Sequence, residues 1–337
     1  MTIAAAGMDL GCLGEASERL PRQFAAFDSA SEWLNSPPLL ASALRGTVVL
    51  VNFWTFTCIN WLRTLPYVRG WAEKYRQQLV VIGVHTPEFE VEHHIDHVRA
   101  AVRQLRVEHP VTIDNDYTIW RAFDNHYWPA TYLIDARGRI RYRHFGEGAY
   151  DEIERAIQRA LKDTIGSPDE SLVSISPTGV EAQADWNNLK SGENYVGYAR
   201  TENFASRGGR VLDRPHAYDT PTRLSLHQWA LSGDWTLGKQ AAVLNNPHGR
   251  IQYRFHARDL HLVMGPGRQS QPIRFRVSLD GQLPADAHGV DVDTEGHGLV
   301  AEPRLYQLIR QLDRIVDRHF EVEFFDAGVE ALAFTFG

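Results

Sequence analysis

Cys58 is the residue whose type and setting point most clearly to chemistry. Residues 48–53 form a short, apolar, β-branched run, which predicts a strand buried on both faces. A polar turn follows, and residues 62–75 have helical spacing. Cys58 therefore lies where a strand gives way to a helix, and there the free N–H groups and the positive end of the helix dipole favour a thiolate. The alternative is that Cys58 is a small buried core residue.

The residues around Cys58 form a pattern with one conspicuous departure. Trp54, Cys58 and Pro66 fit W-x-x-x-C-x-x-C-x-x-x-x-P, but Trp61 replaces the second cysteine. The pattern resembles the active-site segment of the thioredoxin superfamily. A dithiol oxidoreductase attacks with its first cysteine, and its second resolves the mixed disulfide. With Trp61 in that place, Cys58 would act alone and be resolved by an external thiol or by Cys12.

A closer resemblance covers nearly the whole chain. The segments that carry it are 52–60, 63–67, 81–89, 114–117 and 127–130, followed by 302–310 and the final residues. Together they resemble TlpA-like thioredoxin domains at the soluble C-terminal end of DipZ-type cytochrome c biogenesis proteins. Those proteins end in a sandwich that looks like a carbohydrate-binding module. The resemblance implies that Pro129 is cis and lies against Cys58.

Other residues near this pattern have two interpretations each. Trp54, Phe56, Trp61 and Trp128 could form an aromatic collar that shields the thiolate and selects the substrate, although core packing explains Trp54 better. We expect Trp61, in the first helical turn, to cap or narrow access to Cys58. Thr55 matches the T-x-x-C of peroxiredoxins, where the hydroxyl helps to hold the peroxide, but Val51 stands where that motif has proline.

The elements that must position Cys58 alternate between strands and helices. After residues 48–53 and 62–75, the expected strands and helices are listed in chain order: strand 79–84, helix 92–105, strand 111–113, helix 117–123, strands 127–135 and 140–145, and helix 150–161. A short helix is expected within 29–35, because a serine precedes it and Pro37 ends it. This order predicts an α/β thioredoxin-like three-layer sandwich.

The second half of the chain changes character. Short alternating apolar runs recur between turn signals, which predicts an all-β jelly-roll or β-sandwich domain. We therefore expect a flexible N-terminus (1–20), a thioredoxin-like domain (21–165), a Ser/Pro-rich linker (166–176) and a sandwich domain (177–337). A length of 337 residues is consistent with two cores.

Composition excludes several classes of function. A net charge of −7 argues against a general nucleic-acid surface, and two cysteines exclude a disulfide scaffold. No run approaches the roughly 20 apolar residues of a membrane span. The N-terminus lacks a basic start and a long apolar core, so a cytoplasmic location is expected.

Two further groups of residues could bind ligands. His93 and His97, one helical turn apart in a glutamate-rich stretch, could hold zinc, but a solvated charged face is the simpler explanation. The aromatic residues of the second half could stack on sugar rings, although most should be core. They are Trp186, Tyr195, Tyr198, Trp229, Trp235 and Tyr253.

The sequence thus predicts a thiol-based redox protein that uses Cys58 alone. It would be a monothiol disulfide reductase or a thiol peroxidase, with supporting residues Trp54, Thr55, Trp61, Pro66, Trp128 and Pro129. Its partners would be a protein or small thiol, a disulfide or a peroxide, and a saccharide could bind the second domain; no cofactor, metal or nucleic acid is expected. The alternative is a thioredoxin-fold adaptor that has lost turnover.

Overall fold

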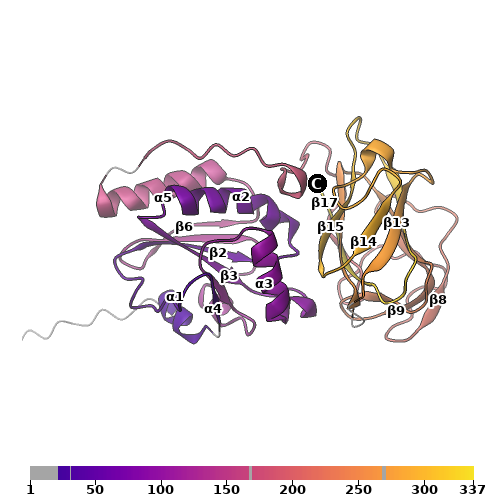
Figure 1. The fold of residues 1–337 in the computed structure, drawn as a ribbon, viewed down its shortest axis with the longest axis horizontal. Coiled ribbons are helices and arrows are strands. Elements are labelled where there is room, and N and C mark those ends of the chain that lie inside the picture. The colour runs from indigo at the N-terminus through magenta and orange to yellow at the C-terminus, as the bar shows by residue number, and fades with distance from the viewer. Residues whose placement is uncertain (1–21, 31, 167–168, 268–270) are drawn as a thin grey trace, which may run out of the picture.

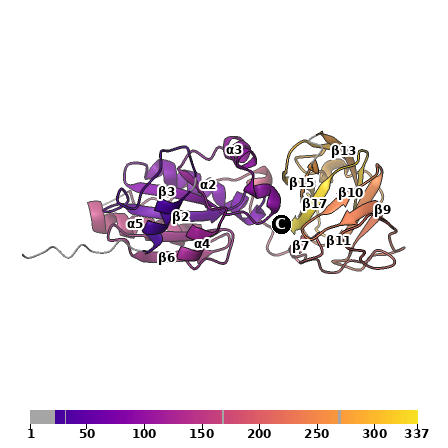
Figure 2. The ribbon, with the colours of Figure 1, turned by 90° about the horizontal axis from the view of Figure 1, so that it is seen from below.

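The computed structural model describes residues 22–30, 32–166, 169–267 and 271–337, which form two units (Figure 1). The first unit contains a six-stranded sheet and the second an eleven-stranded sheet. An extended segment after the last helix joins the units, and the end of the chain lies between them in both views (Figures 1 and 2). The predicted flexible N-terminus and Cys12 fall outside the described residues.

The first sheet has a parallel centre and antiparallel edges. Its strands are β1 (Trp33–Leu34), β2 (Val48–Trp54), β3 (Leu79–His85), β4 (Val111–Ile113), β5 (Ala130–Ile134) and β6 (Ile140–Phe145). Their order is β1-β4-β3-β2-β5-β6, and β2, β3 and β4 are parallel. Every residue of β2 is buried, as its β-branched apolar run predicts. Cys58 therefore follows a central strand.

Helices cover both faces of this sheet. They are α1 (Arg22–Ala25), α2 (Ile59–Lys74), α3 (Ile95–Gln104), α4 (Thr118–Ala122) and α5 (Tyr150–Ile165). Trp71 of α2 and Ile157 of α5 pack with Leu50 on one face. Phe27 and Phe123 pack with Phe53 on the other, beside α1 and α4. The predicted thioredoxin-like three-layer arrangement is confirmed.

The helix expected within residues 29–35 is wrong. Trp33 and Leu34 form β1 and pair with Thr112 and Val111. Asn35 then turns the chain with a φ of 63° and donates its side-chain amide to Val107 and His109. Pairing with a distant strand thus overrides the local helix signal.

The predicted linker is held against the first unit over the part that the structure describes. Gln158 donates to the carbonyl of Ser171 at 2.8 Å, and the Val173 N–H donates to Glu154 at 2.9 Å. The side chain of Ile175 then packs over Gly70 of α2. The segment therefore runs as an ordered strap towards the second unit, while the proposed domain boundaries stay a prediction.

The second sheet is antiparallel throughout its ladders. Its strands are β7 (Asn194–Tyr195), β8 (His216–Tyr218), β9 (Trp229–Leu237), β10 (Ala242–Leu244), β11 (Gly249–Phe255), β12 (Asp259–Gly265), β13 (Ile273–Leu279), β14 (His297–Val300), β15 (Arg304–Arg310), β16 (Arg318–Phe324) and β17 (Glu330–Phe336). The main order is β14-β13-β16-β11-β9-β10-β17-β12-β15. The alternating apolar runs of the sequence do not mark β8, β14 and β15 as strands.

This sheet curls because β9 belongs to both of its halves. Its first residues, from Trp229, pair with β11, and its last, to Leu237, pair with β10. Between them Gly233 has a φ of 93°, and a Cβ there would lie 2.9 Å from the Cα of Gly249. Only glycine suits such a bend. The two halves enclose a single core, which confirms the predicted all-β sandwich-like architecture.

The two units share an apolar interface. Leu305 of β15 and Leu332 of β17 lie in the same buried cluster as Phe56, Leu62 and other residues around the cysteine helix. Charged and polar pairs surround this contact, including Gln104–Glu302 at 2.7–2.8 Å and Arg69–Glu181 at 2.6 Å. The second unit therefore packs against the end of the first unit that carries Cys58.

Candidate active site

Cys58 caps the N-terminus of α2, at the end of the central strand. Its backbone is extended, with φ −77° and ψ 113°, and its side chain accepts no capping hydrogen bond. The nearby N–H groups of Trp61 and Asn60 nevertheless act to lower the pKa of the thiol. Its Sγ lies 3.7 Å from the carbonyl oxygen of Trp128. The residue is half-buried.

The Trp128–Pro129 bond is cis, as expected. The indole N–H of Trp128 donates to the carbonyl of Thr86 at 3.0 Å, and its ring lies against Trp120 with centroids 4.3 Å apart. These contacts fix the segment that precedes β5. Pro66 is buried within α2, about two turns beyond Cys58.

Trp61 does not cap the site, contrary to the expectation. It is 1% exposed, stacks on Trp54 and donates its indole N–H to Asn52 at 2.9 Å. The reason is helical periodicity, because positions 61, 65 and 68 share one face of α2 and that face is buried. Trp54 is fully buried, so its core interpretation is correct.

Thr55 lies inside the protein, beside a buried network around Glu92. Its side chain is fully buried, and its hydroxyl has no hydrogen-bond partner among the described residues. The Glu92 carboxylate accepts hydrogen bonds from the Thr57 hydroxyl at 2.5 Å and the Phe89 N–H at 2.9 Å. The network braces the loop before Cys58 and the loop after β3.

The electrostatic environment of Cys58 differs from the sequence expectation of a low-pKa thiol. Burial raises the pKa of the Cys58 thiol, and the carboxylates of Glu88 and Glu193 raise it further. The N–H groups of Trp61 and Asn60 lower the pKa but do not offset the burial. Cys58 in this closed arrangement therefore favours the neutral thiol.

Residues of the second unit complete the surroundings of Cys58, and the sequence did not reveal this. Tyr195 donates its hydroxyl to Glu88 at 2.6 Å and lies 3.1 Å from Glu193. Arg200 pairs with Glu88 at 2.8 Å and lies over the ring of Tyr195 at 3.5 Å. We call Glu88, Glu193, Tyr195 and Arg200 the cross-unit cluster.

The other ligand-binding predictions receive little support. Among the residues that the structure describes, no group of His, Cys, Asp and Glu is arranged to hold a metal ion. Trp229, Trp235 and Tyr253 are core residues of the second sheet, and Tyr195 belongs to the cross-unit cluster. Tyr198 is partly buried against that core, and Trp186 is 60% exposed. Most of the predicted sugar-stacking aromatics are therefore core or contact residues.

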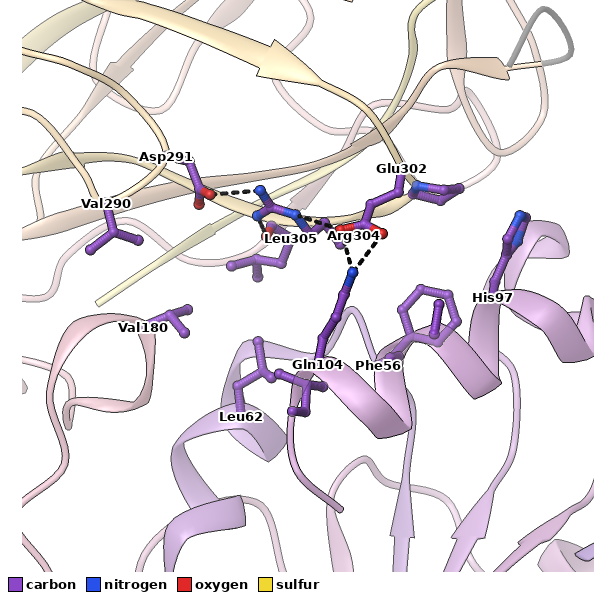
Figure 3. A pocket seen from close by; sticks show the side chains of 14 residues that line it. Phe56, Leu62, His97, Gln104, Val180, Val290, Asp291, Glu302, Arg304 and Leu305 are labelled. Carbon is purple, nitrogen blue, oxygen red and sulfur yellow. Dashed lines mark hydrogen bonds and ion pairs between the residues drawn. The ribbon is translucent and has the colours of Figure 1, made fainter. Parts of the chain in front are cut away.

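A separate pocket of about 240 Å³ lies between the units (Figure 3). Phe56 and Leu62 line it from the first unit, and Val180, Val290 and Leu305 line it from the strap and the second unit. Figure 3 shows the side chain of Gln104 reaching from α3 to Glu302 of the second unit. Phe56 links the pocket to the loop that precedes Cys58.

Within the described ranges, the helices are too short or too polar to cross a membrane. The cytoplasmic location stays a prediction.

Two family descriptions match parts of this chain. Residues 35–143 match the AhpC/TSA family, and residues 191–337 match the "Thioredoxin like C-terminal domain". The first match contains Cys58 and Pro129, and the second contains Glu193, Tyr195 and Arg200. The cross-unit cluster is thus assembled from both matched segments.

Known proteins resemble the chain over different lengths. Protein DipZ of Mycobacterium tuberculosis is 37% identical over 238 residues, which is 69% of this chain and 34% of DipZ. The chain thus spans about a third of that relative's length. Thiol-disulfide oxidoreductase YkuV of Bacillus subtilis is 27% identical over 132 residues, or 39% of this chain and 89% of YkuV. The solution structure of a thioredoxin-like protein in the oxidized form is 28% identical, with a TM-score of 0.39, over 43% of this chain and 97% of that one.

Proposed function

Because the chain is a thioredoxin-superfamily protein that resembles DipZ and thiol-disulfide oxidoreductases, we propose that it exchanges disulfides through Cys58 alone. The observation that carries the proposal is the position of Cys58 at the N-cap of α2, 3.7 Å from the carbonyl that precedes cis-Pro129. There the helix N–H groups can stabilise a thiolate, and the adjoining backbone can align a substrate disulfide.

The reaction forms one mixed disulfide and needs a second thiol to complete it. The Cys58 thiolate attacks one sulfur of the substrate disulfide, the substrate S–S bond breaks, and the other substrate sulfur leaves as a thiolate. A small or protein thiol then attacks the mixed disulfide and releases Cys58. Trp61 has no thiol and cannot resolve the mixed disulfide. Cys12 is the other cysteine of the chain and could do so.

Disulfide exchange is a better proposal than peroxide reduction. A peroxidase of the T-x-x-C type needs a threonine hydroxyl at the peroxide, whereas the Thr55 side chain is fully buried. No such requirement applies to a disulfide, since both of its sulfurs can be held by backbone groups.

A second candidate is an adaptor without turnover. The buried Trp61 and the raised pKa of the Cys58 thiol, caused mainly by burial, favour it. In either case the second unit would supply recognition of the partner. If it binds a saccharide, Trp186 is the one exposed aromatic residue of the predicted set on which the sugar could stack.

Trapping of the mixed disulfide separates the two candidates. The Cys12→Ser protein, which keeps Cys58 as its one thiol, is incubated with an oxidised protein substrate such as insulin and analysed by non-reducing mass spectrometry. An oxidoreductase gives a Cys58-linked adduct that glutathione releases with turnover, and Cys58→Ser gives none. No adduct, or an adduct that no thiol releases, would favour the adaptor.

A further inference from the structure

The cross-unit cluster is fixed beside Cys58 by contacts in both units. The Trp128 carbonyl touches the thiol at 3.7 Å, and the Trp128 indole holds the Thr86 carbonyl at 3.0 Å. Glu88 lies two residues beyond Thr86, so the same contacts position its loop. Tyr195 and Cys58 both pack against the buried cluster that contains Phe56. Glu88 and Glu193 accordingly act on the thiol electrostatically.

The charges of this cluster do not cancel. Arg200 pairs with Glu88 at 2.8 Å, and Tyr195 donates to the same carboxylate. Among the described residues Glu193 forms no ion pair; its contact is the Tyr195 hydroxyl at 3.1 Å. Two carboxylates and one guanidinium therefore leave a net negative charge at the edge of the cysteine site.

We infer that the cross-unit cluster makes Cys58 selective for cationic disulfides, meaning those flanked by lysine or arginine, over anionic ones such as glutathione disulfide. The inference rests on the proposed function and names its substrate class. A negative charge close to the reacting sulfur attracts a cationic reagent and repels an anionic one. The second unit would thus set specificity through Glu193.

Charge-matched methanethiosulfonates test this selectivity directly. The Cys58 thiolate attacks their sulfenyl sulfur, the S–SO2 bond breaks, methanesulfinate leaves, and Cys58 gains a mixed disulfide. The rate with the ethyltrimethylammonium reagent is divided by the rate with the ethylsulfonate reagent, in the Cys12→Ser protein at pH 8 and low salt. The same ratio for 2-mercaptoethanol normalises the intrinsic reactivity of the reagents, and the thiolate fraction cancels.

We expect a normalised ratio of about three to ten, since each unit charge at this range changes a rate by roughly two- to five-fold. Glu193→Gln should lower the ratio most. Glu73→Gln is the matched control, because it removes a 76% exposed carboxylate from the C-terminal end of α2, about 22 Å along the helix from Cys58. It should leave the ratio unchanged, and 1 M salt should reduce the ratio towards one.

The pH dependence of the ratio gives a second readout. Glu193 keeps contact with solvent, but the partial desolvation of its carboxylate and the neighbouring Glu88 carboxylate raise its pKa to about 7. Glu193 therefore gains its charge as the pH rises through 7, and the ratio should increase between pH 6 and 8 in the parent but not in Glu193→Gln.

A normalised ratio of one, or an elevated ratio that Glu193→Gln leaves unchanged, would overturn the inference. Failure of the proposed function looks different, because it is the absence of a releasable adduct with protein disulfides whatever the ratio. Peptide disulfides flanked by lysines or by glutamates extend the test: faster exchange with the lysine peptide supports the inference, and equal rates contradict it.

Discussion

The indole rings of Trp54 and Trp61 are stacked, with centroids 4.2 Å apart and planes 20° from parallel. Trp61 occupies the position at which a dithiol protein of this fold has its second cysteine. The place of the missing thiol is therefore filled by a core residue that also binds Asn52. A large side chain here stabilises the unit and excludes an internal disulfide.

Replacing Trp61 should accordingly be costly. We expect Trp61→Cys to lower the free energy of unfolding by about 3–5 kcal/mol, because it opens a cavity beneath Trp54. Trp61→Phe keeps an aromatic ring and loses the bond to Asn52, so about 1–3 kcal/mol is expected. Urea unfolding measures both. If Trp61→Cys remained within 1 kcal/mol of the parent, the packing described for Trp61 would be incorrect.

The same variant tests dithiol behaviour. Positions 58 and 61 are one helical turn apart, which suits disulfide geometry. Oxidised Trp61→Cys should lose two free thiols, and the reduced protein should gain insulin-disulfide reductase activity if it folds at the assay temperature. Strong activity in the parent would mean that Cys12 or another thiol already resolves the adduct.

The pH dependence of Cys58 alkylation tests its electrostatic environment. Burial, Glu88 and Glu193 raise the pKa of the thiol, so in the Cys12→Ser protein the iodoacetamide rate should inflect above the ordinary value of about 8.5. Glu193→Gln should move the inflection downwards. Because the folded protein holds this proton more tightly than the unfolded chain does, the contribution of Cys58 to the free energy of unfolding decreases as the pH rises above about 8.5. An inflection below 8.5 would restore the original expectation of an activated thiolate.

The sequence predicted those parts of the fold whose signals are local. The β-branched run of β2 and the periodic apolar residues of α2 identified the setting of Cys58, and family resemblance identified the cis bond before Pro129. The helix prediction for Trp33 and Leu34 was wrong because these residues form a strand of only two residues, which depends on pairing with β4. Trp61 was misplaced because the first turn of this helix was expected to be exposed, whereas every residue from Trp61 to Pro66 is buried.

The contribution of the second unit to the site could not be predicted in this way. Glu88 and Tyr195 are 107 positions apart and meet only when both units have folded and docked. No local pattern marks Glu193 or Arg200, which look like ordinary surface charges in the sequence. Their role becomes visible only from the contact between the units.

Arg63 provides a test of how the units are held together. It is 1% exposed, pairs with the buried Glu147 at 3.1 Å and donates to the Phe336 carbonyl of the second unit at 3.3 Å. Arg63→Met should cost about 3–5 kcal/mol in urea unfolding, because Glu147 loses its buried partner. Arg63→Met combined with Glu147→Leu should recover most of the loss. A double variant as unstable as the single one would show that Glu147 is not the cause.

The buried His261 should make the stability of the folded protein depend on pH in the acid range. It is fully buried on β12, and it pairs in register with Gln307 and Thr335 on the neighbouring strands. These side chains share the sheet face of Val263, which packs towards the first unit. Neither ring nitrogen of His261 has a hydrogen-bond partner among the residues that the structure describes.

Burial lowers the pKa of His261 to about 3, and Arg63 contributes to this shift. The unfolded chain binds a proton at His261 below about pH 6.5, whereas the folded chain does not. The stability that neutral His261 provides is therefore present above pH 6.5 and falls by up to about 1.4 kcal/mol per pH unit as the pH decreases towards 3.

The variant His261→Leu cannot titrate at this position. Between pH 6.5 and 5 its free energy of unfolding should therefore fall by about 2 kcal/mol less than that of the parent. Urea unfolding at the two pH values, followed by tryptophan fluorescence and circular dichroism, gives this difference. Equal losses in parent and variant would mean that His261 is already hydrated and protonated in the folded protein, and that the interface around it is open to water.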